Sequence, residues 1–249
     1  MKRTVFITGA TSGIGMATAK KLASNYRLIL CGRRQNRLDE IQEELAEITE
    51  VKTIQFDVSD KEAVYHAVEN LEDEWKNIDI LINNAGNAHG LAPFDTADLE
   101  DLEAMIDINV KGLIYVSKAI IPILKKSTNA HIINISSIAG KEVYPNAATY
   151  CASKAAVESL SKGMRYDLLP YGIKVSNVAP GAVETEFSMV RFKGNQELSD
   201  NVYKGFEPLI GEDIANAIDY LLNQPEHVQI ADVTIFPKAQ AGGTVIYRK

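Results

Sequence analysis

Tyr150, Lys154 and Ser137 are the residues of this chain whose types and spacing most clearly indicate chemistry. Tyr150 and Lys154 stand at positions i and i+4, so on a helix they lie on one face and reach the same ligand. A free tyrosine titrates near pH ~10, and a nearby cation lowers this pKa because it favours the phenolate. The hydroxyl of Ser137 adds a hydrogen-bonding group. The three residues therefore predict a proton-transfer site that needs no metal.

Short apolar runs alternate with longer amphipathic segments along the whole chain, and this pattern predicts an α/β fold. Several runs are continuously apolar, which is typical of strands buried on both faces of a parallel sheet. The predicted strands are 5–8, 28–31, 53–56, 78–83, 131–136, 175–179 and 228–236, and the predicted helices are 13–24, 36–48, 61–75, 99–124, 149–169 and 211–223. We expect a single Rossmann-like, doubly wound domain over residues 1–249, with a mostly parallel sheet of about seven strands and helices on both faces.

A glycine-rich turn with the sequence T-G-A-T-S-G-I-G follows the first predicted strand and opens the first predicted helix. Gly9, Gly13 and Gly15 remove side chains where a backbone approaches a pyrophosphate and where the helix packs on the sheet. The helix directs free N–H groups and the positive end of its dipole at the phosphates. The turn therefore predicts a dinucleotide site. Its other predicted contacts are Thr11, Ser12 and Ile14.

The end of the second predicted strand reads Cys31-Gly32-Arg33-Arg34 and carries no acidic residue. An acid at this place binds the ribose 2′-hydroxyl of NAD, whereas guanidinium groups hold a 2′-phosphate through charge-assisted hydrogen bonds. Arg33 and Arg34 therefore favour NADP(H) over NAD(H).

Two further strand ends carry candidate cofactor contacts. Asp57 and Val58 follow the third predicted strand, where Asp57 either accepts from the adenine amino group or caps a helix. Asn84, Ala85 and Gly86 follow the fourth, where small residues let the chain pass close to a cofactor. We expect the cofactor-binding part to cover about residues 1–135 and the catalytic and substrate-lid part about 136–249.

Residues 184–210 are the least regular stretch and are long for an ordered connection, so they are interpreted as a substrate lid. A carboxylated substrate needs a nearby cation, for which Arg191 is the first candidate, ahead of Lys193 and Lys141. Glu184 and Glu186 would repel such a substrate unless they point outward or pair with a substrate amine.

The bulk composition indicates a soluble globular protein that acts on small molecules. The formal net charge of −7 argues against nucleic acid and anionic membranes as partners, and no apolar run approaches the ~18 residues of a membrane span. Cys31 and Cys151 have no metal or redox spacing, and the four histidines lack a zinc pattern, so no metal site is predicted. Free thiols fit a cytoplasmic location.

Taken together, these motifs resemble the short-chain dehydrogenase/reductase family. The matching motifs are T-G-x-x-x-G-x-G at Thr8–Gly15, N-N-A-G at Asn83–Gly86, Asn109 on the long fourth helix, Ser137, Y-x-x-x-K at Tyr150–Lys154, and P-G at Pro180-Gly181 followed by Thr185. The resemblance implies that Tyr150 is the general acid/base, and that Lys154 lowers the pKa of Tyr150 and binds the nicotinamide ribose. It further implies that Ser137 polarises the substrate carbonyl and that Asn109 holds a water of the proton relay. The implied nicotinamide-side contacts are Pro180, Gly181, Val183 and Thr185.

The segment Thr185–Gly194 resembles NADP-dependent dehydrogenases of small 3-hydroxy acids such as L-serine, L-allo-threonine and 3-hydroxypropionate. A 3-oxoacyl thioester reductase or general carbonyl reductase on the same scaffold is the alternative, and a non-catalytic cofactor-sensing protein is a more remote one. The resemblance also implies a homo-oligomer, a dimer or a tetramer, built on the helices at 99–124 and 149–169. Because Ser12 stands where many NADP-dependent relatives carry a basic residue, the 2′-phosphate is expected to rest on Arg33 and Arg34.

Overall fold

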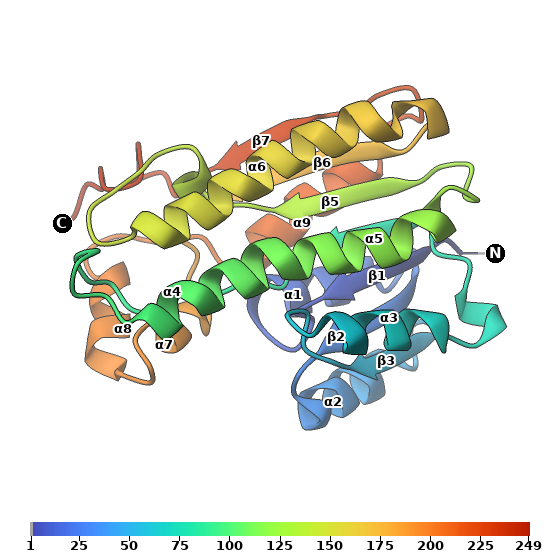
Figure 1. The fold of residues 1–249 in the computed structure, drawn as a ribbon, viewed down its shortest axis with the longest axis horizontal. Coiled ribbons are helices and arrows are strands. Elements are labelled where there is room, and N and C mark those ends of the chain that lie inside the picture. The colour runs from blue at the N-terminus through green and yellow to red at the C-terminus, as the bar shows by residue number, and fades with distance from the viewer. Residues whose placement is uncertain (1) are drawn as a thin grey trace.

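The centre of the computed structural model, which describes residues 2–249, is one parallel sheet of seven strands (Figure 1). The strand order is β3-β2-β1-β4-β5-β6-β7. The strands are β1 (Thr4–Thr8), β2 (Arg27–Gly32), β3 (Val51–Gln55), β4 (Ile80–Asn83), β5 (His131–Ile135), β6 (Lys174–Pro180) and β7 (Asp232–Ile235). β1, β4, β5 and β6 are buried along their whole length, which explains their continuously apolar runs.

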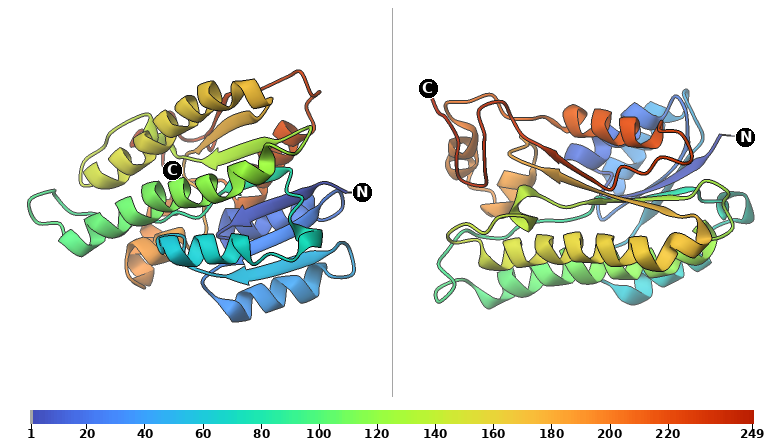
Figure 2. Two further views of the ribbon diagram at one scale, coloured as in Figure 1. Left: turned by 45° about the vertical axis from the view of Figure 1, so that its right-hand side comes forward. Right: turned by 90° about the horizontal axis from the view of Figure 1, so that it is seen from above.

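Helices cover both faces of this sheet, as the view from above in Figure 2 shows. The α-helices are α1 (Gly13–Leu22), α2 (Gln35–Leu45), α3 (Lys61–Glu69), α4 (Leu99–Ile106), α5 (Leu113–Leu124), α6 (Ala148–Leu168), α7 (Phe187–Arg191), α8 (Gln196–Tyr203) and α9 (Gly211–Leu222). Shorter helical turns are η1 (Asp73–Trp75), η2 (Asp107–Gly112), η3 (Ile138–Gly140) and η4 (Leu169–Tyr171). α1, α2 and α9 pack on one face, and α3, α5 and α6 on the other.

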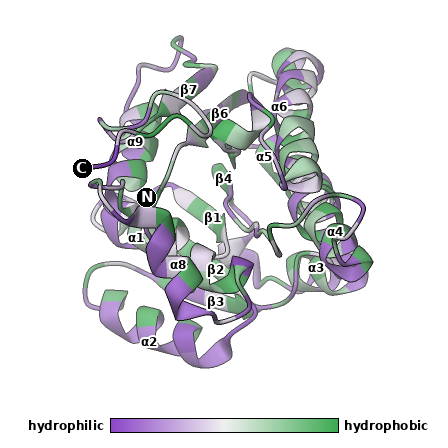
Figure 3. Cartoon of the chain, turned by 90° about the vertical axis from the view of Figure 1, so that its left-hand side faces the viewer, coloured by the Kyte–Doolittle hydropathy of each residue, from purple (hydrophilic) through white to green (hydrophobic). Residues whose placement is uncertain are grey.

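Two hydrophobic cores result because successive residues of a strand point to opposite faces of the sheet. In β1, Val5 and Ile7 contact the core under α1 and α9, whereas Phe6 contacts the core under α3 and α5. Figure 3 shows the same arrangement by hydropathy, with hydrophobic segments facing inward and hydrophilic segments on the outer side of helices such as α2. The two cores fix the register of the sheet, because a slip by one residue would exchange them.

The sequence-based prediction of the fold class is confirmed, since all seven predicted strands form one sheet with helices on both faces. Four segments differ in detail. The predicted lid contains the short helices α7 and α8, the predicted helix at 61–75 is divided into α3 and η1, and the long fourth helix includes the π-helical turn η2 between α4 and α5. The last strand begins only at Asp232, because it is a half-exposed edge strand with one neighbour.

The topology places a crevice at the carboxyl ends of β1 and β4. The chain winds outward from β1 to β2 and β3, and then returns to β4 and winds in the opposite direction. Loops leaving β1 and β4 therefore separate, and ligands of open parallel sheets bind in the opening between them.

Candidate active site

A cavity of about 750 Å³ opens at the carboxyl end of the sheet, and it brings together almost every residue predicted from the sequence. Its lining includes Gly9, Thr11, Ser12, Gly13, Ile14, Arg33, Arg34, Asp57, Val58, Asn84, Ala85, Gly86, Ser137, Tyr150, Lys154, Pro180, Gly181, Val183, Thr185 and Arg191. Gly15 and Asn109 do not line the cavity but lie directly behind it. A Cβ on Gly15 would be 2.3 Å from the carbonyl oxygen of Gly9, so Gly15 allows α1 to pack on the turn.

The glycine-rich turn has the backbone geometry that an oxyanion site requires. Gly9 has a φ of +66°, and a Cβ there would be 2.9 Å from the Cα of Ala85. Ser12, the residue before α1, makes no side-chain capping hydrogen bond, so the first amide groups of α1 remain available to a ligand. These amides and the positive end of the helix dipole fit a pyrophosphate.

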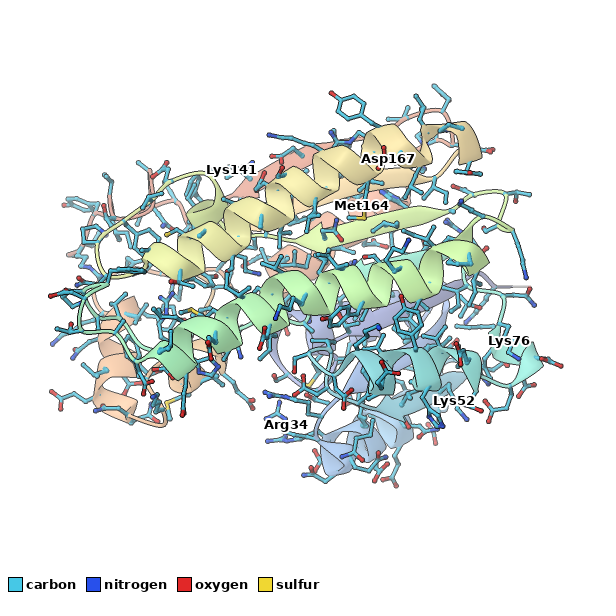
Figure 4. All side chains as sticks on the ribbon, viewed as in Figure 1. Arg34, Lys52, Lys76, Lys141, Met164 and Asp167 are labelled. Atoms are coloured by element: carbon cyan, nitrogen blue, oxygen red, sulfur yellow. The ribbon has the colours of Figure 1, made fainter. Side chains whose placement is uncertain are left out.

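Arg33 and Arg34 lie past the carboxyl end of β2, where Arg34 is labelled in Figure 4. Arg34 donates to the carbonyl and hydroxyl oxygens of Thr11 at 3.2 Å and pairs with Glu186 at 2.8 Å. Arg33 is 3.4 Å from Asp57. Asp57 also accepts from the amide and hydroxyl of Ser59, and these bonds lower its pKa against the effect of burial.

Asp57 does not cap α3, because the capping side chain there is Asp60, which accepts from the amide of Ala63. The helix-cap alternative for Asp57 is therefore wrong. Since Asp57 lines the cavity beside Val58, the adenine-contact alternative stays a prediction.

Tyr150 and Lys154 lie on consecutive turns of α6 and face the cavity together, as their spacing predicts. Both are buried, at 7 % and 5 % exposure. Burial lowers the pKa of Lys154 to about 8 and raises the pKa of Tyr150 to about 12. Arg191 and the hydroxyl of Ser137 oppose the effect of burial on Tyr150, because both favour the phenolate.

The ammonium of Lys154 makes one hydrogen bond, to the carbonyl oxygen of Ile135 at 3.0 Å. An ammonium has three donors, so two remain for a ligand. A Cβ on Gly86 would be 3.1 Å from the Lys154 Nζ atom, and glycine at this place therefore leaves room for the lysine. Lys154 is thus held at the cavity wall with donors directed to its interior.

Asn109 is buried in the π-helical turn η2 and orders the wall behind Tyr150. Its side chain accepts from the amide of Asn87 at 2.8 Å and donates to the carbonyl of Asn87 and to the hydroxyl of Ser153. Ser153 in turn donates to the carbonyl of Tyr150. π-turns within helices frequently occur at functional sites.

Arg191, at the end of α7, lies over the ring of Tyr150. Its guanidinium carbon is 4.9 Å from the ring centre of Tyr150 and 5.4 Å from that of Phe187. Its Nε atom is buried and makes no hydrogen bond. Of the other two predicted cations, Lys141 (labelled in Figure 4) pairs with Glu158 and Asp232, and Lys193 pairs with Asp101. Neither lines the cavity.

Several cavity residues were not predicted from the sequence. Tyr144 lines the wall, and the C-terminal segment adds Thr244, Ile246 and Arg248. Glu186, which the sequence suggested only as a charge that repels a carboxylate, also lines the cavity. The tail is folded back by main-chain bonds from Tyr247 to Ala239 and from Lys249 to Gly205. No local pattern marks these residues, because their place depends on how the tail crosses the molecule.

The cavity fits a dinucleotide cofactor on its own geometry. One end offers free helix amides and an unobstructed glycine backbone, and the other offers the unused donors of Lys154 beside Tyr150. Among residues 2–249, no group of three His, Cys, Asp or Glu side chains is placed to hold a metal ion.

Comparisons with known proteins agree with this class of site. The model of the short chain dehydrogenase family matches residues 3–196. The chain is 41 % identical to an NADP-dependent 3-hydroxy acid dehydrogenase of Schizosaccharomyces pombe, over 99 % of this chain and 97 % of the relative. It is also 41 % identical to sulfoacetaldehyde reductase 2 of Chromohalobacter salexigens, over 97 % and 96 % of the two chains. The closed form of a serine dehydrogenase complexed with NADP⁺ superimposes with a TM-score of 0.93 at 37 % identity, with 99 % of each chain covered.

A nucleotide-binding crevice at the switch point of a doubly wound sheet, with a tyrosine and a lysine at its inner end, defines a dehydrogenase-type oxidoreductase. The chain belongs to the short chain dehydrogenase family. The family and the enzyme class predicted from the sequence are therefore confirmed.

Proposed function

We propose that this protein is an NADP-dependent dehydrogenase that oxidises the 3-hydroxyl of small 3-hydroxy acids, a class that includes L-serine, L-allo-threonine and 3-hydroxypropionate. The observation that carries the proposal is Arg191, a partly buried guanidinium beside the Tyr150 ring that forms no ion pair within 4.0 Å with any of residues 2–249. A guanidinium binds a carboxylate through two parallel hydrogen bonds, and such a substrate would satisfy the unused Nε donor. The relatives named as 3-hydroxy acid and serine dehydrogenases support the same substrate class.

In the proposed mechanism, Tyr150 as phenolate accepts the proton of the substrate hydroxyl and returns it in the reductive direction. Ser137 donates a hydrogen bond to the substrate oxygen, and Lys154 binds the ribose of the cofactor. A bound NADP(H) would supply the acceptor or donor of the carbinol hydride. Asn109 binds Asn87 and Ser153 beside Tyr150, and in the proposed mechanism it also binds the water of the proton relay. General acid/base catalysis of this kind contributes about 10²–10⁴-fold.

The proposed cofactor is NADP(H), bound by the residues of the glycine-rich turn and by those that line the rest of the cavity. Arg33 and Arg34 at the end of β2 support a 2′-phosphate there, in the absence of an acid that would bind a 2′-hydroxyl. A relative named as NADP-dependent and a serine dehydrogenase solved with NADP⁺ support the same assignment.

A second candidate substrate class is the small sulfonated aldehydes. The relative named sulfoacetaldehyde reductase 2 is as similar to this chain as the 3-hydroxy acid dehydrogenase of fission yeast. A sulfonate carries the same charge as a carboxylate and accepts the same guanidinium hydrogen bonds, so Arg191 suits both. A bulky 3-oxoacyl thioester has no carboxylate for Arg191 to bind, and this residue therefore disfavours the thioester-reductase alternative.

The proposal also includes a homo-oligomer, a dimer or a tetramer, in which α5 and α6 form the contact. Exposed apolar residues on these helices, such as Ile114 and Tyr166, support this surface. Sedimentation equilibrium measures the mass of the assembly. No helix among residues 2–249 is long and apolar enough to cross a membrane. A cytoplasmic location completes the proposal, and fractionation of the source cells tests it.

The function is tested by nicotinamide absorbance with purified protein, NADP or NAD, and a panel of L-serine, L-allo-threonine, 3-hydroxypropionate and their methyl esters. Sulfoacetaldehyde and a 3-oxoacyl thioester are assayed with NADPH. We expect turnover of the free acids with NADP, and a loss in kcat/KM for Arg191→Met that is at least tenfold larger with the acids than with the esters. Equal effects on acids and esters would remove Arg191 as the anchor. Near wild-type turnover in Tyr150→Phe would overturn the mechanism.

A further inference from the structure

Glu186 links two parts of the cavity that are far apart in the sequence. It lies between Thr185 and the first residue of α7, and one carboxylate oxygen is 2.8 Å from an Nη atom of Arg34. Its other oxygen is 3.9 Å from an Nη atom of Arg37, on the first turn of α2. The carboxylate therefore lies between two guanidinium groups, where an oxyanion is favoured.

One of these two guanidinium groups, that of Arg34, belongs to the proposed 2′-phosphate site. Arg34 lines the cavity and is held by its bonds to Thr11, a residue of the glycine-rich turn, at the end of the cavity proposed for the adenosine ribose. Arg33 is paired with another carboxylate, that of Asp57. Each of the two arginines proposed to bind the phosphate is thus already paired with a carboxylate of the protein itself.

A 2′-phosphate and the carboxylate of Glu186 need the same N–H donors of Arg34. Arg34 has five donors, of which those on the Thr11 side are committed and one on the opposite side serves Glu186. A bidentate bond from this outer edge to phosphate uses the Nη1 atom, the nitrogen that now donates to Glu186. The negative charges of a 2′-phosphate and of the Glu186 carboxylate would also repel each other when both lie beside Arg34.

We propose that Glu186 is an internal competitor for the 2′-phosphate, that NADP(H) displaces its carboxylate from Arg34, and that Arg37 is a further phosphate-binding residue. This inference rests on the proposed use of NADP(H). It makes Glu186 a determinant of cofactor selectivity, because its carboxylate opposes the binding of a 2′-phosphate and not of a 2′-hydroxyl.

The displacement involves only the start of the lid. α7 remains attached through the bond from the amide of Gly90 to the carbonyl of Arg191, at 2.8 Å, and through the hydroxyl pair of Ser188 and Tyr203, at 2.7 Å. The substrate end of α7 therefore keeps its place when Glu186 is released. We accordingly expect the effect of Glu186 on nucleotide binding to exceed its effect on substrate KM.

The test compares 2′,5′-ADP with 5′-ADP by isothermal titration calorimetry, because these probes differ by the 2′-phosphate and need no turnover. Glu186→Gln should bind 2′,5′-ADP about twofold to fivefold more tightly than the wild type at low salt, the range of half-exposed ion pairs. Its affinity for 5′-ADP should not change. Because salt screens exposed charges, the difference should diminish at high ionic strength.

Glu184→Gln is the matched control, since it removes the same charge two residues away, where the carboxylate forms no ion pair within 4.0 Å among the described residues. It should leave both affinities nearly unchanged. Arg37→Gln in the Glu186→Gln background should weaken 2′,5′-ADP binding severalfold, and an unchanged affinity there would remove Arg37 from the site.

Unchanged or weaker binding of 2′,5′-ADP by Glu186→Gln would overturn the inference, because Glu186 would then be neutral or would hold Arg34 in place for the phosphate. Failure of the proposed cofactor gives a different result. In one such result, the wild type binds both probes equally while Glu186→Gln gains a preference for 2′,5′-ADP. That result would support the competitor role of Glu186 and contradict the proposed NADP preference of the native protein. If neither the wild type nor Glu186→Gln distinguishes the two probes, the competitor role of Glu186 and the NADP preference are both contradicted.

Discussion

At the scale of single residues, Tyr150 and Arg191 form the most informative pair of the site. Tyr150 has a pKa raised to about 12 by burial, and Arg191 is the cation that opposes this effect most strongly. The sequence pattern assigned that role to Lys154, four residues along the same helix. In the fold, Lys154 donates to the carbonyl of Ile135, and a second cation, Arg191 of α7, lies over the tyrosine ring; the role of Lys154 stays a prediction.

Arg191→Met is therefore expected to raise the pKa of Tyr150. Oxidation needs the phenolate, so the rise of kcat with pH should move to higher pH, by about one unit for the loss of a neighbouring opposite charge. The measurement is the pH dependence of kcat for oxidation of a methyl ester, which lacks the carboxylate that Arg191 would bind. Arg191→Lys keeps the charge and should keep most of the wild-type profile. A profile that does not move in Arg191→Met would contradict the electrostatic role.

Lys154 gives a second prediction, on stability. Burial lowers its pKa from 10.5 to about 8, so the native state binds fewer protons than the unfolded state between these values, and wild-type stability rises with pH in this window. Below pH 8 the buried charge costs roughly 3 kcal/mol. Lys154→Met should therefore increase the free energy of unfolding at pH 7, by an amount that decreases towards pH 10.5, while activity is lost.

Urea unfolding at pH 7 and pH 10 measures this difference. Lys141→Met is the contrasting variant, because Lys141 pairs with Glu158 and Asp232, and its loss leaves the carboxylate of Glu158 buried without its cation. It should destabilise the protein. A Lys154→Met variant that is less stable than the wild type at pH 7 would show that burial of this ammonium carries no cost.

At the scale of elements, the polar inner face of α6 and the π-helical turn η2 determine where the site forms. α6 directs Ser153, Lys154 and Glu158 inward, so its buried face is polar where an ordinary amphipathic helix is apolar. Ser153 bonds to Asn109 of η2, and this contact joins the two helices beneath the cavity. The elements could be predicted from periodicity. The π turn could not, because it depends on contacts with α6 and with Asn87, which are distant in the sequence.

Gly112, the last residue of η2, provides a test of this packing. A Cβ there would be 2.8 Å from a methyl carbon of Val58, which lines the cavity. Gly112→Ala should lower the free energy of unfolding by about 1–3 kcal/mol through overpacking and should weaken cofactor binding. Gly163→Ala, in the exposed interior of α6 with open space around it, should instead raise stability by about 0.5–1 kcal/mol. Equal effects of the two changes in urea unfolding would contradict this account.

At the scale of the whole molecule, the cavity joins residues from nearly the full length of the chain, from Gly9 in the first turn to Arg248 in the C-terminal tail. The predicted division into a cofactor-binding part and a catalytic part remains a prediction. Both parts line the same cavity, where Arg34 from the first part forms an ion pair with Glu186 from the second. A ligand in this cavity therefore stabilises both halves of the sheet together.

NADP at a hundredfold excess over its Kd should raise the free energy of unfolding by about 2.7 kcal/mol, because a ligand that binds only the native state shifts the equilibrium by mass action. NAD at the same concentration should produce a smaller shift. Differential scanning fluorimetry measures both as changes in Tm. Equal shifts with the two cofactors would contradict the assignment of Arg33 and Arg34 to the 2′-phosphate.

The sequence by itself determined the alternation of strands and helices, the glycine-rich turn, and the pairing of Tyr150 with Lys154 on one helix face. These features are local: periodicity, backbone freedom at glycine and the i, i+4 spacing act within a few residues. Only the tertiary structure decided that Arg191 lies over Tyr150, that Glu186 pairs with Arg34 and that the C-terminal tail lines the cavity. Such contacts join residues far apart in the chain, and they depend on how the lid and the tail pack over the end of the sheet, which no local pattern records.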